Sequence, residues 1–482
     1  MFDLRPVGYV IGLLLVALGV SMAIPWAVDI VWETGGGGTF AVSGVITILF
    51  GGSMALASAN SRSPGLNLQQ AFLLTVLSWV ALPIFAALPF WLGAPNASYT
   101  DAFFEAVSGM TTTGSTVFSN LSQLPMGTLL WRGMMQWFGG VGIIVVAMAF
   151  LPTLKVGGMQ LFRSEGFDTL GKVLPRAGEI AGSISIIYLV LTLACILSYS
   201  LVGIEFFDAL VLSLTTVSTG GFANSDASFG QFQGVPEYVA AIFMLLASLP
   251  FIRYVQMMRG TARPLLRDSQ VRAFLRTALA LTLVITLYRI LVNGEFLEES
   301  FREAVFNITS ILSGTGYASV DYQLWGPFPV IMFFMLGLVG GCAGSTCCSI
   351  KVFRFQLLFI SIKQQVKRIH SPHGVFGARY EGRPVEEEVI SSVMAFFVMF
   401  FLTLAVLTVV LSLLGLDFIT AVSGAATALA NIGPGLGPEI GPAGNFGGLS
   451  DAVKWVLSGA MLLGRLELIS VFILFTVGFW RG

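Results

Sequence analysis

Charged residues are scarce in this chain. Of its 482 residues only 11% are charged, whereas soluble domains carry about 25%. Hydrophobic residues make up 55% of the chain, and the mean hydropathy is +0.85. Apolar runs long enough to cross a bilayer recur along its whole length. The composition therefore excludes a soluble globular protein and predicts an all-α integral membrane protein with many spans.

Histidine and cysteine are also rare, and their placement excludes several kinds of chemistry. The two histidines, His370 and His373, fall in a basic loop, and the spans hold no paired carboxylates, so we expect no intramembrane enzyme. The four cysteines form no CxxC pair, which leaves no pattern for zinc or a disulfide framework. A net charge of −1 argues against nucleic acid as a partner. There is no ATP-binding motif, so any nucleotide effect must come through a partner.

Ten apolar stretches can each supply the roughly 20 residues that a hydrocarbon core needs. The first is too long for the core of a signal peptide and is followed by further spans, so we expect it to be retained. The stretches are residues 7–31, 40–58, 68–92, 126–152, 178–202, 238–258, 273–292, 328–362 with an interruption, 389–414 and 453–479.

Shorter apolar segments between these spans indicate a repeat. They are residues 101–114, 208–220, 302–316 and 417–433, each too short to cross a bilayer. The repeating unit is a helix, a half-helix with a pore loop, and a helix, used four times around a central pore. The expected units are 1–66 for an extra N-terminal helix pair, then 67–157, 158–265, 266–384 and 385–482 for the four pore repeats.

Each short segment ends in a glycine motif. The motifs are Thr111-Thr112-Thr113-Gly114, Val217-Ser218-Thr219-Gly220, Ser313-Gly314-Thr315-Gly316 and Ala430-Asn431-Ile432-Gly433. A ring of backbone carbonyls can replace the water around a potassium ion, and glycine allows the dihedral angles that direct carbonyls at an axis. A half-helix entering from outside also turns the negative end of its dipole toward the membrane centre. The four motifs therefore predict a cation-selective filter.

The residues predicted to bind potassium are the last two of each motif. They are Thr113, Gly114, Thr219, Gly220, Thr315, Gly316, Ile432 and Gly433, with Thr112, Ser218 and Asn431 as filter neighbours. Threonine hydroxyls can brace the loops or add ligands, whereas Ile432 has no hydroxyl. We therefore expect a less symmetric pore, with weaker discrimination, than in a tetrameric channel. The alternative is that the glycines are helix caps without ion contact.

The signs of charge are segregated between the two sides of the membrane. With a cytoplasmic N-terminus, every inner loop is basic, as the positive-inside rule requires. These loops carry Arg62, Lys155, Arg163, Lys172, Arg176, Arg259, Arg263, Arg267, Arg272, Arg276, Lys363, Lys367, Arg368, Arg379 and Arg383. The outer segments carry most of the acidic residues, among them Asp101, Glu105 and Asp226. An acidic vestibule would concentrate cations over the pore.

With these motifs, spans and sidedness, the chain resembles the Trk/Ktr/HKT superfamily of cation transporters, and specifically the TrkH-like subunit of bacterial Trk-type potassium uptake. The extra N-terminal helix pair favours the Trk branch over the shorter Ktr branch. In this family a filter glycine in each repeat goes with potassium selectivity, and Gly114 stands where the sodium-favouring HKT members carry serine. The resemblance implies potassium uptake across the cell inner membrane through a channel-like pore. A sodium-coupled or less selective cation symporter is the alternative.

The resemblance also implies ligands and partners. Potassium is the expected metal ion, with no organic cofactor on this chain. The expected assembly is a homodimer docked on a cytosolic, TrkA-like ring of nucleotide-binding regulatory subunits, facing the basic inner loops. Without the resemblance, those charges would only set the topology and contact anionic membrane lipid.

Small and polar residues interrupt the eighth apolar stretch, from Gly337 to Lys351. Unwound backbone at membrane depth is tolerated only where protein buries it or where it lines a water-filled cavity. The segment resembles the intramembrane gating loop of the Trk family, although Cys347 and Cys348 stand where glycines are common. The predicted gate residues are Gly340, Gly341, Gly344, Ser345 and Thr346, together with Arg465. The alternative is small-residue packing between continuous helices.

Arg465 is expected near the middle of the last span, where it cannot easily reach either membrane surface. It could donate hydrogen bonds to carbonyls freed by the interrupted eighth helix, or project into the pore as an electrostatic barrier. Glu467 lies two positions away and so points elsewhere on a helix, which argues against an ion pair between them. In the family that the chain resembles, an arginine at this position lies near the gating loop.

Overall fold

The structure is a computed structural model that describes residues 3–60, 66–149, 177–258, 260–374 and 376–481. Within these residues it is predominantly helical, with one small hairpin of β1 (Arg379–Tyr380) and β2 (Arg383–Pro384). The predicted all-α class is confirmed. Some predictions concern residues outside the described ranges: the end of the fourth span at Pro152, the repeat boundary at 157/158, and Arg62, Lys155, Arg163, Lys172, Arg176 and Arg259.

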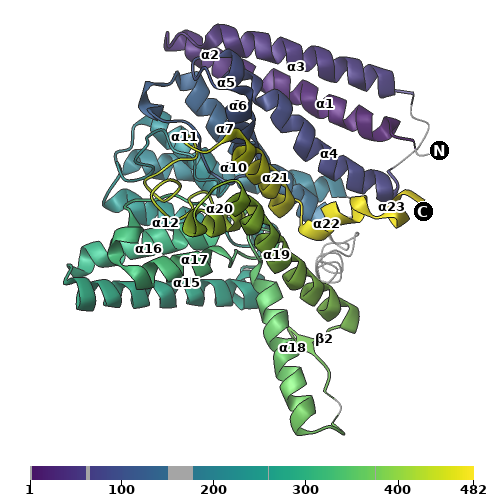
Figure 1. The fold of residues 1–482 in the computed structure, drawn as a ribbon, viewed down its shortest axis with the longest axis vertical. Helices are drawn as coiled ribbons and strands as arrows, with labels where there is room; N and C mark the ends of the chain where they lie inside the picture. Colours follow the sequence, from purple (N-terminus) through teal and green to yellow (C-terminus); the bar gives the residue numbers. More distant parts are fainter. Residues whose placement is uncertain (1–2, 61–65, 150–176, 259, 375, 482) are drawn as a thin grey trace.

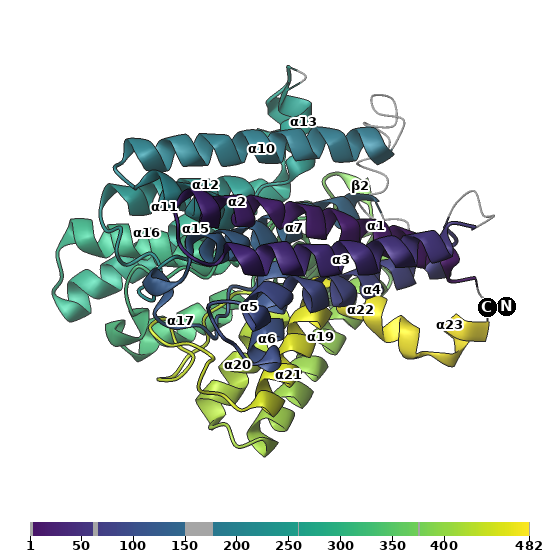
Figure 2. The same cartoon turned by 90° about the horizontal axis from the view of Figure 1, so that it is seen from above.

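The expected N-terminal pair consists of α1 (Arg5–Ser21), continued by α2 (Ala23–Val31), and α3 (Gly37–Ser58). α1 and α3 lie side by side in both views (Figures 1 and 2). Their backbones approach closely, because a Cβ added at Gly12 would lie 2.7 Å from the Gly51 carbonyl oxygen. Glycine permits such an approach between helices in a membrane.

Four sets of helices follow, each in the expected order of a helix, a short helix and a helix. The short helices are α6 (Tyr99–Met110), α11 (Phe206–Val217), α16 (Leu297–Ser313) and α20 (Phe418–Ala430). Before them lie α4 (Leu68–Ala86) with α5 (Leu88–Leu92), α10 (Ala177–Leu201), α15 (Ser269–Tyr288) and α19 (Glu387–Leu413). After them lie α7 (Met126–Ala149), α12 (Val235–Ala247) with α13 (Phe251–Met258), α17 (Pro327–Gly337) with α18 (Val352–His370), and α21 (Asp451–Arg465) with α22 (Leu468–Phe472).

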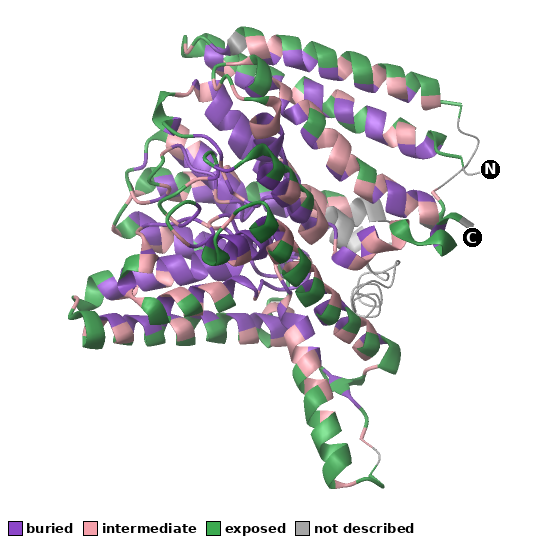
Figure 3. Ribbon diagram, in the orientation of Figure 1, coloured by how far each residue is buried: buried purple, intermediate pink, exposed green. Residues whose placement is uncertain are grey.

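Short elements complete the described chain: η1 (Leu121–Gln123), α14 (Arg263–Arg267), the π-helical turn η2 (Arg289–Asn293), η3 (Tyr322–Trp325), η4 (Ile473–Phe475) and α23 (Val477–Arg481). Six of the described helices are long and apolar enough to cross a bilayer, or eight if each bent pair counts as one span. Figure 3 shows exposed faces on these outer helices and buried residues gathered at the centre. Many exposed side chains are large and apolar, as lipid-facing residues must be.

The short helices belong to the buried centre of the molecule. Ser98 caps the start of α6 by accepting a hydrogen bond from the Asp101 N–H at 3.1 Å, and Asp417 caps α20 in the same way. Beyond the cap, every residue of α6 from Ala102 to Met110 is buried. A helix of 12 residues cannot cross a bilayer, so its end lies inside the protein.

Two of the expected continuous helices are broken. α12 and α13 meet at 89°, and α21 and α22 meet at 108°. Pro250 lies in the first break, and proline cannot donate the backbone hydrogen bond that would continue a helix. In the second break Glu467 has a φ of +60°, and its carboxylate pairs with Arg354 of α18 at 2.6 Å. Single helices over 238–258 and 453–479 were therefore wrong predictions.

The eighth stretch is interrupted as predicted. Residues 338–351 between α17 and α18 form no helix, which rules out packing of a continuous helix through the small residues. We call this segment the α17–α18 loop. Beyond it, α18 and the hairpin project from the body of the molecule (Figure 1).

Candidate functional site

The four short helices end in the same way, and their ends show which residues correspond between repeats. In each repeat a backbone N–H just past the helix donates to the carbonyl five residues earlier. The pairs are Thr113 to Ser108 at 2.8 Å, Gly220 to Thr215 at 2.8 Å, Thr315 to Ser310 at 2.9 Å and Ile432 to Thr427 at 3.1 Å. The four donor residues are therefore equivalent positions.

In the second repeat, the residue equivalent to Gly114 lies one position later in the chain than the sequence motif predicted. In each repeat the residues before and after the donor have positive φ: Thr112 and Gly114, Thr219 and Gly221, Gly314 and Gly316, Asn431 and Gly433. Gly220, predicted as the counterpart of Gly114, instead corresponds to Thr113, and Gly221 takes the glycine position. Ser218 lies one residue before the position of Thr112. We call residues 112–114, 219–221, 314–316 and 431–433 the glycine loops.

The glycine loops close into a ring. A Cβ added at Gly114 would collide with the carbonyl oxygen of Gly220, one at Gly221 with that of Thr315, and one at Gly316 with that of Ile432. The circle closes at Gly433, where an added Cβ would lie 2.9 Å from the carbonyl oxygen of Thr113. Each glycine thus lies against the next donor's carbonyl, so any side chain at these positions would disturb the ring.

The carbonyl groups of the ring are not equally satisfied. Those of Thr113, Thr315 and Ile432 accept no hydrogen bond from the described residues. The carbonyl of Gly220 accepts one from Nε2 of Gln136 at 2.6 Å, and Oε1 of Gln136 accepts one from the Phe222 N–H at 3.0 Å. Gln136 is fully buried in α7, and its two hydrogen bonds fix the second loop to α7. The prediction that Ile432 makes the ring asymmetric missed this second source of asymmetry.

A cavity of about 260 Å³, the ring cavity, lies on one side of the glycine loops. All four loop glycines, Gly114, Gly221, Gly316 and Gly433, line it. Asp226 is the one carboxylate among its described lining residues, which is fewer than the acidic vestibule predicted. Arg132 lines the same cavity, so its described lining holds one side chain of each charge.

Two other outer carboxylates are held in ion pairs with buried cationic side chains. Glu105 pairs with Nε of Arg132 at 2.8 Å, and Asp101 pairs with Lys454 at 2.5 Å. Arg132 also donates to the Ala223 carbonyl at 2.8 Å and to the Thr116 hydroxyl at 3.2 Å. These contacts connect the chain after the first glycine loop to the chain after the second. Glu105 thus holds Arg132 between these two segments, and neither Glu105 nor Asp101 is among the described residues that line the ring cavity.

The first and fourth loops are joined directly. The Ser115 hydroxyl donates to the Gly433 carbonyl at 2.7 Å. Nδ2 of Asn431 donates to the Thr113 hydroxyl at 2.8 Å and to the Met461 carbonyl at 2.9 Å. Oδ1 of Asn431 is buried and has no partner among the described residues. Asn431 thus connects two repeats and keeps one acceptor free.

The α17–α18 loop lies against the other side of the ring. Its Ser349 N–H donates to the Ala430 carbonyl at 3.0 Å, and Sγ of Cys348 lies 3.7 Å from the Thr112 hydroxyl. These contacts involve residues before the ring donors, whereas the ring cavity is lined by residues after them. The loop and the ring cavity therefore flank the ring on opposite sides.

The break between α12 and α13 anchors this loop. The Ser248 carbonyl accepts from the Cys342 N–H at 3.1 Å, and the Phe251 N–H donates to the Gly344 carbonyl at 2.9 Å. The Thr346 hydroxyl donates to the Ala247 carbonyl at 3.1 Å. Backbone groups that a continuous helix would pair internally are used here to hold the α17–α18 loop.

Arg465 lies at the last turn of α21, at the break, and not in the middle of a continuous span as predicted. Its guanidinium donates to the Thr346 carbonyl at 3.5 Å, to Sγ of Cys348, and to the Gly139 carbonyl of α7 at 3.1 Å. The side chain is 3% exposed, and its Nε has no partner among the described residues. Arg465 therefore fastens the α17–α18 loop to α7. Glu467 pairs with Arg354 and not with Arg465.

The described residues contain no group of three or more histidine, cysteine, aspartate or glutamate side chains that could hold a metal ion. Carbonyl and hydroxyl oxygens of the ring remain as possible ligands. Such neutral oxygens suit a weakly hydrated monovalent cation better than a transition metal.

The chain is similar over nearly its whole length to known potassium uptake proteins. The profile of the TrkH family, described as cation transport protein, matches residues 37–479. The chain is 46% identical to the Trk system potassium uptake protein TrkI of Halomonas elongata, over 99% of this chain and 97% of that one. It is 36% identical to TrkH of Vibrio parahaemolyticus over 99% of both chains. The crystal structure of the potassium transporter TrkH from Vibrio parahaemolyticus superposes with a TM-score of 0.92, at 33% identity and full coverage of both chains.

Proposed function

Because the chain belongs to the TrkH family of cation transport proteins, we propose that it takes up potassium through a pore that runs through the ring of glycine loops. The observation that carries the proposal is the ring itself, in which four equivalent carbonyl groups follow one another and three of them accept no hydrogen bond within the described residues. Carbonyl oxygens without donors are ready to replace water around a dehydrated cation. The ions bound are the substrate, and no organic cofactor is part of the proposal.

The path of the ion follows from the two sides of the ring. A cation enters the ring cavity, which both Asp226 and Arg132 line, and binds to the ring through the carbonyls of Thr113, Gly220, Thr315 and Ile432. The C-terminal ends of the four short helices add negative potential at the same place. With the N-terminus and the basic loops in the cytoplasm, the inside-negative voltage drives entry, by about 2.3 kcal/mol per charge for each 100 mV.

The test is a flux assay on the purified protein in proteoliposomes with potassium, rubidium or sodium. We expect a potassium diffusion potential alone to drive uptake, in the order potassium and rubidium above sodium. A sodium-coupled symporter is the competing function, and potassium uptake that stops when sodium is absent from both sides would favour it. A symporter needs a fixed stoichiometry between two ions, which current reversal potentials would reveal.

The assignment of Gly221, and not Gly220, to the glycine position of the second loop can be tested by substitution. Gly221→Ala is expected to weaken the preference for potassium over sodium by about tenfold, because Gly221 has a φ of +80° and an added Cβ meets the rigid Thr315 carbonyl. Gly220→Ala should have a smaller effect, because Gly220 does not have positive φ and its added Cβ meets a side chain, the buried Gln136, and not the backbone of the next loop. Bi-ionic potentials of the two variants compare them directly. An equal loss in both, or a larger loss at Gly220, would refute the assigned register.

The α17–α18 loop supplies the gate in this proposal. It lies beneath the ring on the side opposite the ring cavity, and Arg465 fastens it to α7. Two of the gate residues bind elements outside the loop: the Thr346 carbonyl accepts from Arg465, and the Gly344 carbonyl accepts from the Phe251 N–H. Gly340, Gly341 and Ser345 form hydrogen bonds with Ile350, Val352 and Cys342. Movement of the loop away from the ring would open the path for ions.

Two exposed surfaces, one on α18 and one on the basic loops, are suited to binding other proteins. The projecting helix α18 exposes Ile362, Val366 and Ile369 at helical spacing, which suits pairing with a second copy of the chain in a homodimer. The basic cytoplasmic face suits a cytosolic, nucleotide-binding regulatory ring of the TrkA type. Reversing the charges of Arg263 and Arg276 is expected to reduce co-purification of that ring, and an unchanged yield would contradict electrostatic docking.

A further inference from the structure

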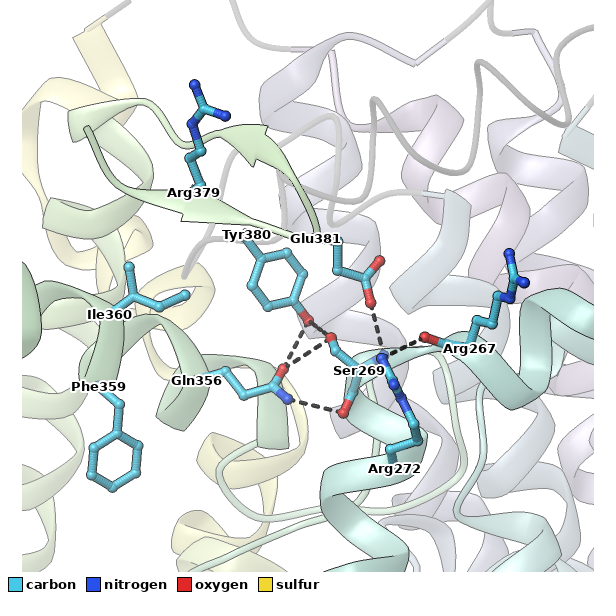
Figure 4. A pocket seen from close by; sticks show the side chains of 9 residues that line it. All are labelled: Arg267, Ser269, Arg272, Gln356, Phe359, Ile360, Arg379, Tyr380 and Glu381. Atoms are coloured by element: carbon cyan, nitrogen blue, oxygen red, sulfur yellow. Dashed lines mark hydrogen bonds between the residues drawn. The ribbon is translucent and has the colours of Figure 1, made fainter. Parts of the chain in front are cut away.

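A second cavity, of about 880 Å³, lies where α14, the start of α15, α18 and the hairpin meet (Figure 4). It belongs to neither the ring nor the α17–α18 loop. Ser269 lines it, and a candidate membrane span begins at this same residue. If α15 spans the bilayer from its first turn, the cavity lies near the level of the lipid headgroups.

The lining of this cavity is strongly basic. Three arginines, Arg267, Arg272 and Arg379, face it, against the single carboxylate of Glu381. That carboxylate already accepts the Ser269 N–H at 2.8 Å. None of the three guanidinium groups forms an ion pair within the described residues. Most of their N–H donors are therefore available, and guanidinium groups bind phosphate with paired hydrogen bonds.

A network of hydrogen bonds fixes the base of the cavity. The Tyr380 hydroxyl donates to Oε1 of Gln356 at 2.9 Å, and Nε2 of Gln356 donates to the Ser269 carbonyl at 3.0 Å. The Ser269 hydroxyl lies 3.2 Å from that of Tyr380, which is only 4% exposed. Figure 4 shows this network between the arginines. Three elements that are distant in sequence are held together before any ligand binds.

One wall of the cavity is apolar. Phe359, which is 67% exposed, and Ile360 line it on α18. A soluble phosphate compound would gain nothing from these side chains, whereas a phospholipid could place hydrocarbon against them and its phosphate among the guanidinium groups. Basic pockets beside membrane helices on the cytoplasmic side are suited to anionic lipid headgroups.

We propose that this cavity binds the phosphate group of an anionic phospholipid from the cytoplasmic leaflet. The leaflet, though not the binding itself, rests on the proposed topology. The phosphate holds α14, α15 and the hairpin together through Arg267, Arg272 and Arg379. Since α18 continues directly from the α17–α18 loop, a lipid at this place contacts the helix that carries the loop.

The test measures lipid binding to full-length protein that has been delipidated in a neutral detergent, by native mass spectrometry. Phosphatidylglycerol, cardiolipin and phosphatidylcholine are titrated in separate arms, and inorganic phosphate and glycerol 3-phosphate in two further arms. We expect the anionic lipids to bind and phosphatidylcholine to bind at least about tenfold more weakly. Competition by inorganic phosphate or glycerol 3-phosphate at concentrations similar to those of the lipid would assign the site to soluble phosphate and overturn the lipid proposal.

Two sets of substitutions distinguish lipid binding in this cavity from attraction to the overall positive charge of the protein. Arg267→Gln, Arg272→Gln and Arg379→Gln combined should weaken phosphatidylglycerol binding at least about tenfold. The matched control combines Arg263→Gln, Arg276→Gln and Arg383→Gln, which removes the same charge from α14, α15 and the hairpin at exposed positions outside the cavity. We expect the control to retain most of the binding.

Equal loss in the two triple variants would overturn the proposal, because net charge alone would then explain the binding. Unchanged lipid binding in the first variant, with loss of a cytosolic regulatory protein from the complex, would instead identify the cavity as a protein docking site. Lipid binding is measured without ion flux. Its failure therefore leaves the transport proposal intact, and a failure of transport leaves the lipid result intact.

Discussion

Replacing Gly114 by serine is expected to lower the preference for potassium over sodium by about tenfold or more. Gly114 has a φ of +86°, a conformation that costs a residue with a side chain roughly 1–2 kcal/mol. The new Cβ would also collide with the Gly220 carbonyl oxygen, which is backbone and cannot swing aside. The ring must therefore widen or tilt at this contact. A change of 1.4 kcal/mol in the binding of one ion relative to another is a tenfold change in selectivity.

The measurement is the permeability ratio from bi-ionic potentials, with uptake of rubidium as a second readout. Gly459→Ser is the matched control, because Gly459 lies on α21 with negative φ and no atom within 4 Å of an added Cβ. The control should keep the parent's ratio. If Gly114→Ser also kept it, in protein of normal yield and thermal stability, the ring would have no part in selecting ions.

Arg465→Ala is expected to raise the basal cation flux about tenfold to hundredfold when no regulatory partner is present. The substitution removes the hydrogen bonds to the Thr346 and Gly139 carbonyls and the contact with Cys348. Leaving such buried partners unsatisfied costs about 1–3 kcal/mol, and the loss falls on the state in which the loop lies against the ring. The loop then spends more time away from the path of the ions.

Two comparisons make the Arg465 result specific. Arg465→Lys keeps the charge with fewer and differently placed donors, so its flux should lie between those of the parent and the alanine variant. Deleting part of residues 340–349 should raise the flux at least as strongly, while the preference for potassium survives in both. Unchanged or reduced flux from well-folded alanine and deletion variants would leave Arg465 as a packing residue.

Much of this architecture could be predicted from the sequence, because membrane helices need long apolar runs and the short segments are visibly too brief to cross. The broken helices were harder to predict. Pro250 offered a signal for the first break that the hydropathy of 238–258 concealed. The second break depends on the pair between Glu467 and Arg354, which are 113 residues apart, so no local pattern reveals it.

Some features of the ring could likewise be predicted from the local sequence, whereas others depend on residues that are distant in sequence. Its four glycine-containing motifs were readable as a repeat, but the adjacent Gly220 and Gly221 left the register of the second loop ambiguous. The backbone hydrogen bond from Gly220 to Thr215 decides it. The role of Gln136 could not be predicted, because a glutamine within an apolar span says nothing of which carbonyl it reaches. A polar residue in a membrane span was nevertheless a signal worth following.

The contacts between the first and fourth glycine loops have a consequence for biosynthesis. Ser115 and Gly433 are 318 residues apart, so ribosomes must add almost the entire chain before the ring can close. Until then Thr113 lacks the neighbour that completes its side of the circle, whatever the earlier repeats have achieved in the membrane. A product truncated after the third repeat would therefore have three quarters of a circle and a gap open to lipid or water. If ions cross through the ring, as we propose, an unfinished chain would have no complete ion path during its own synthesis.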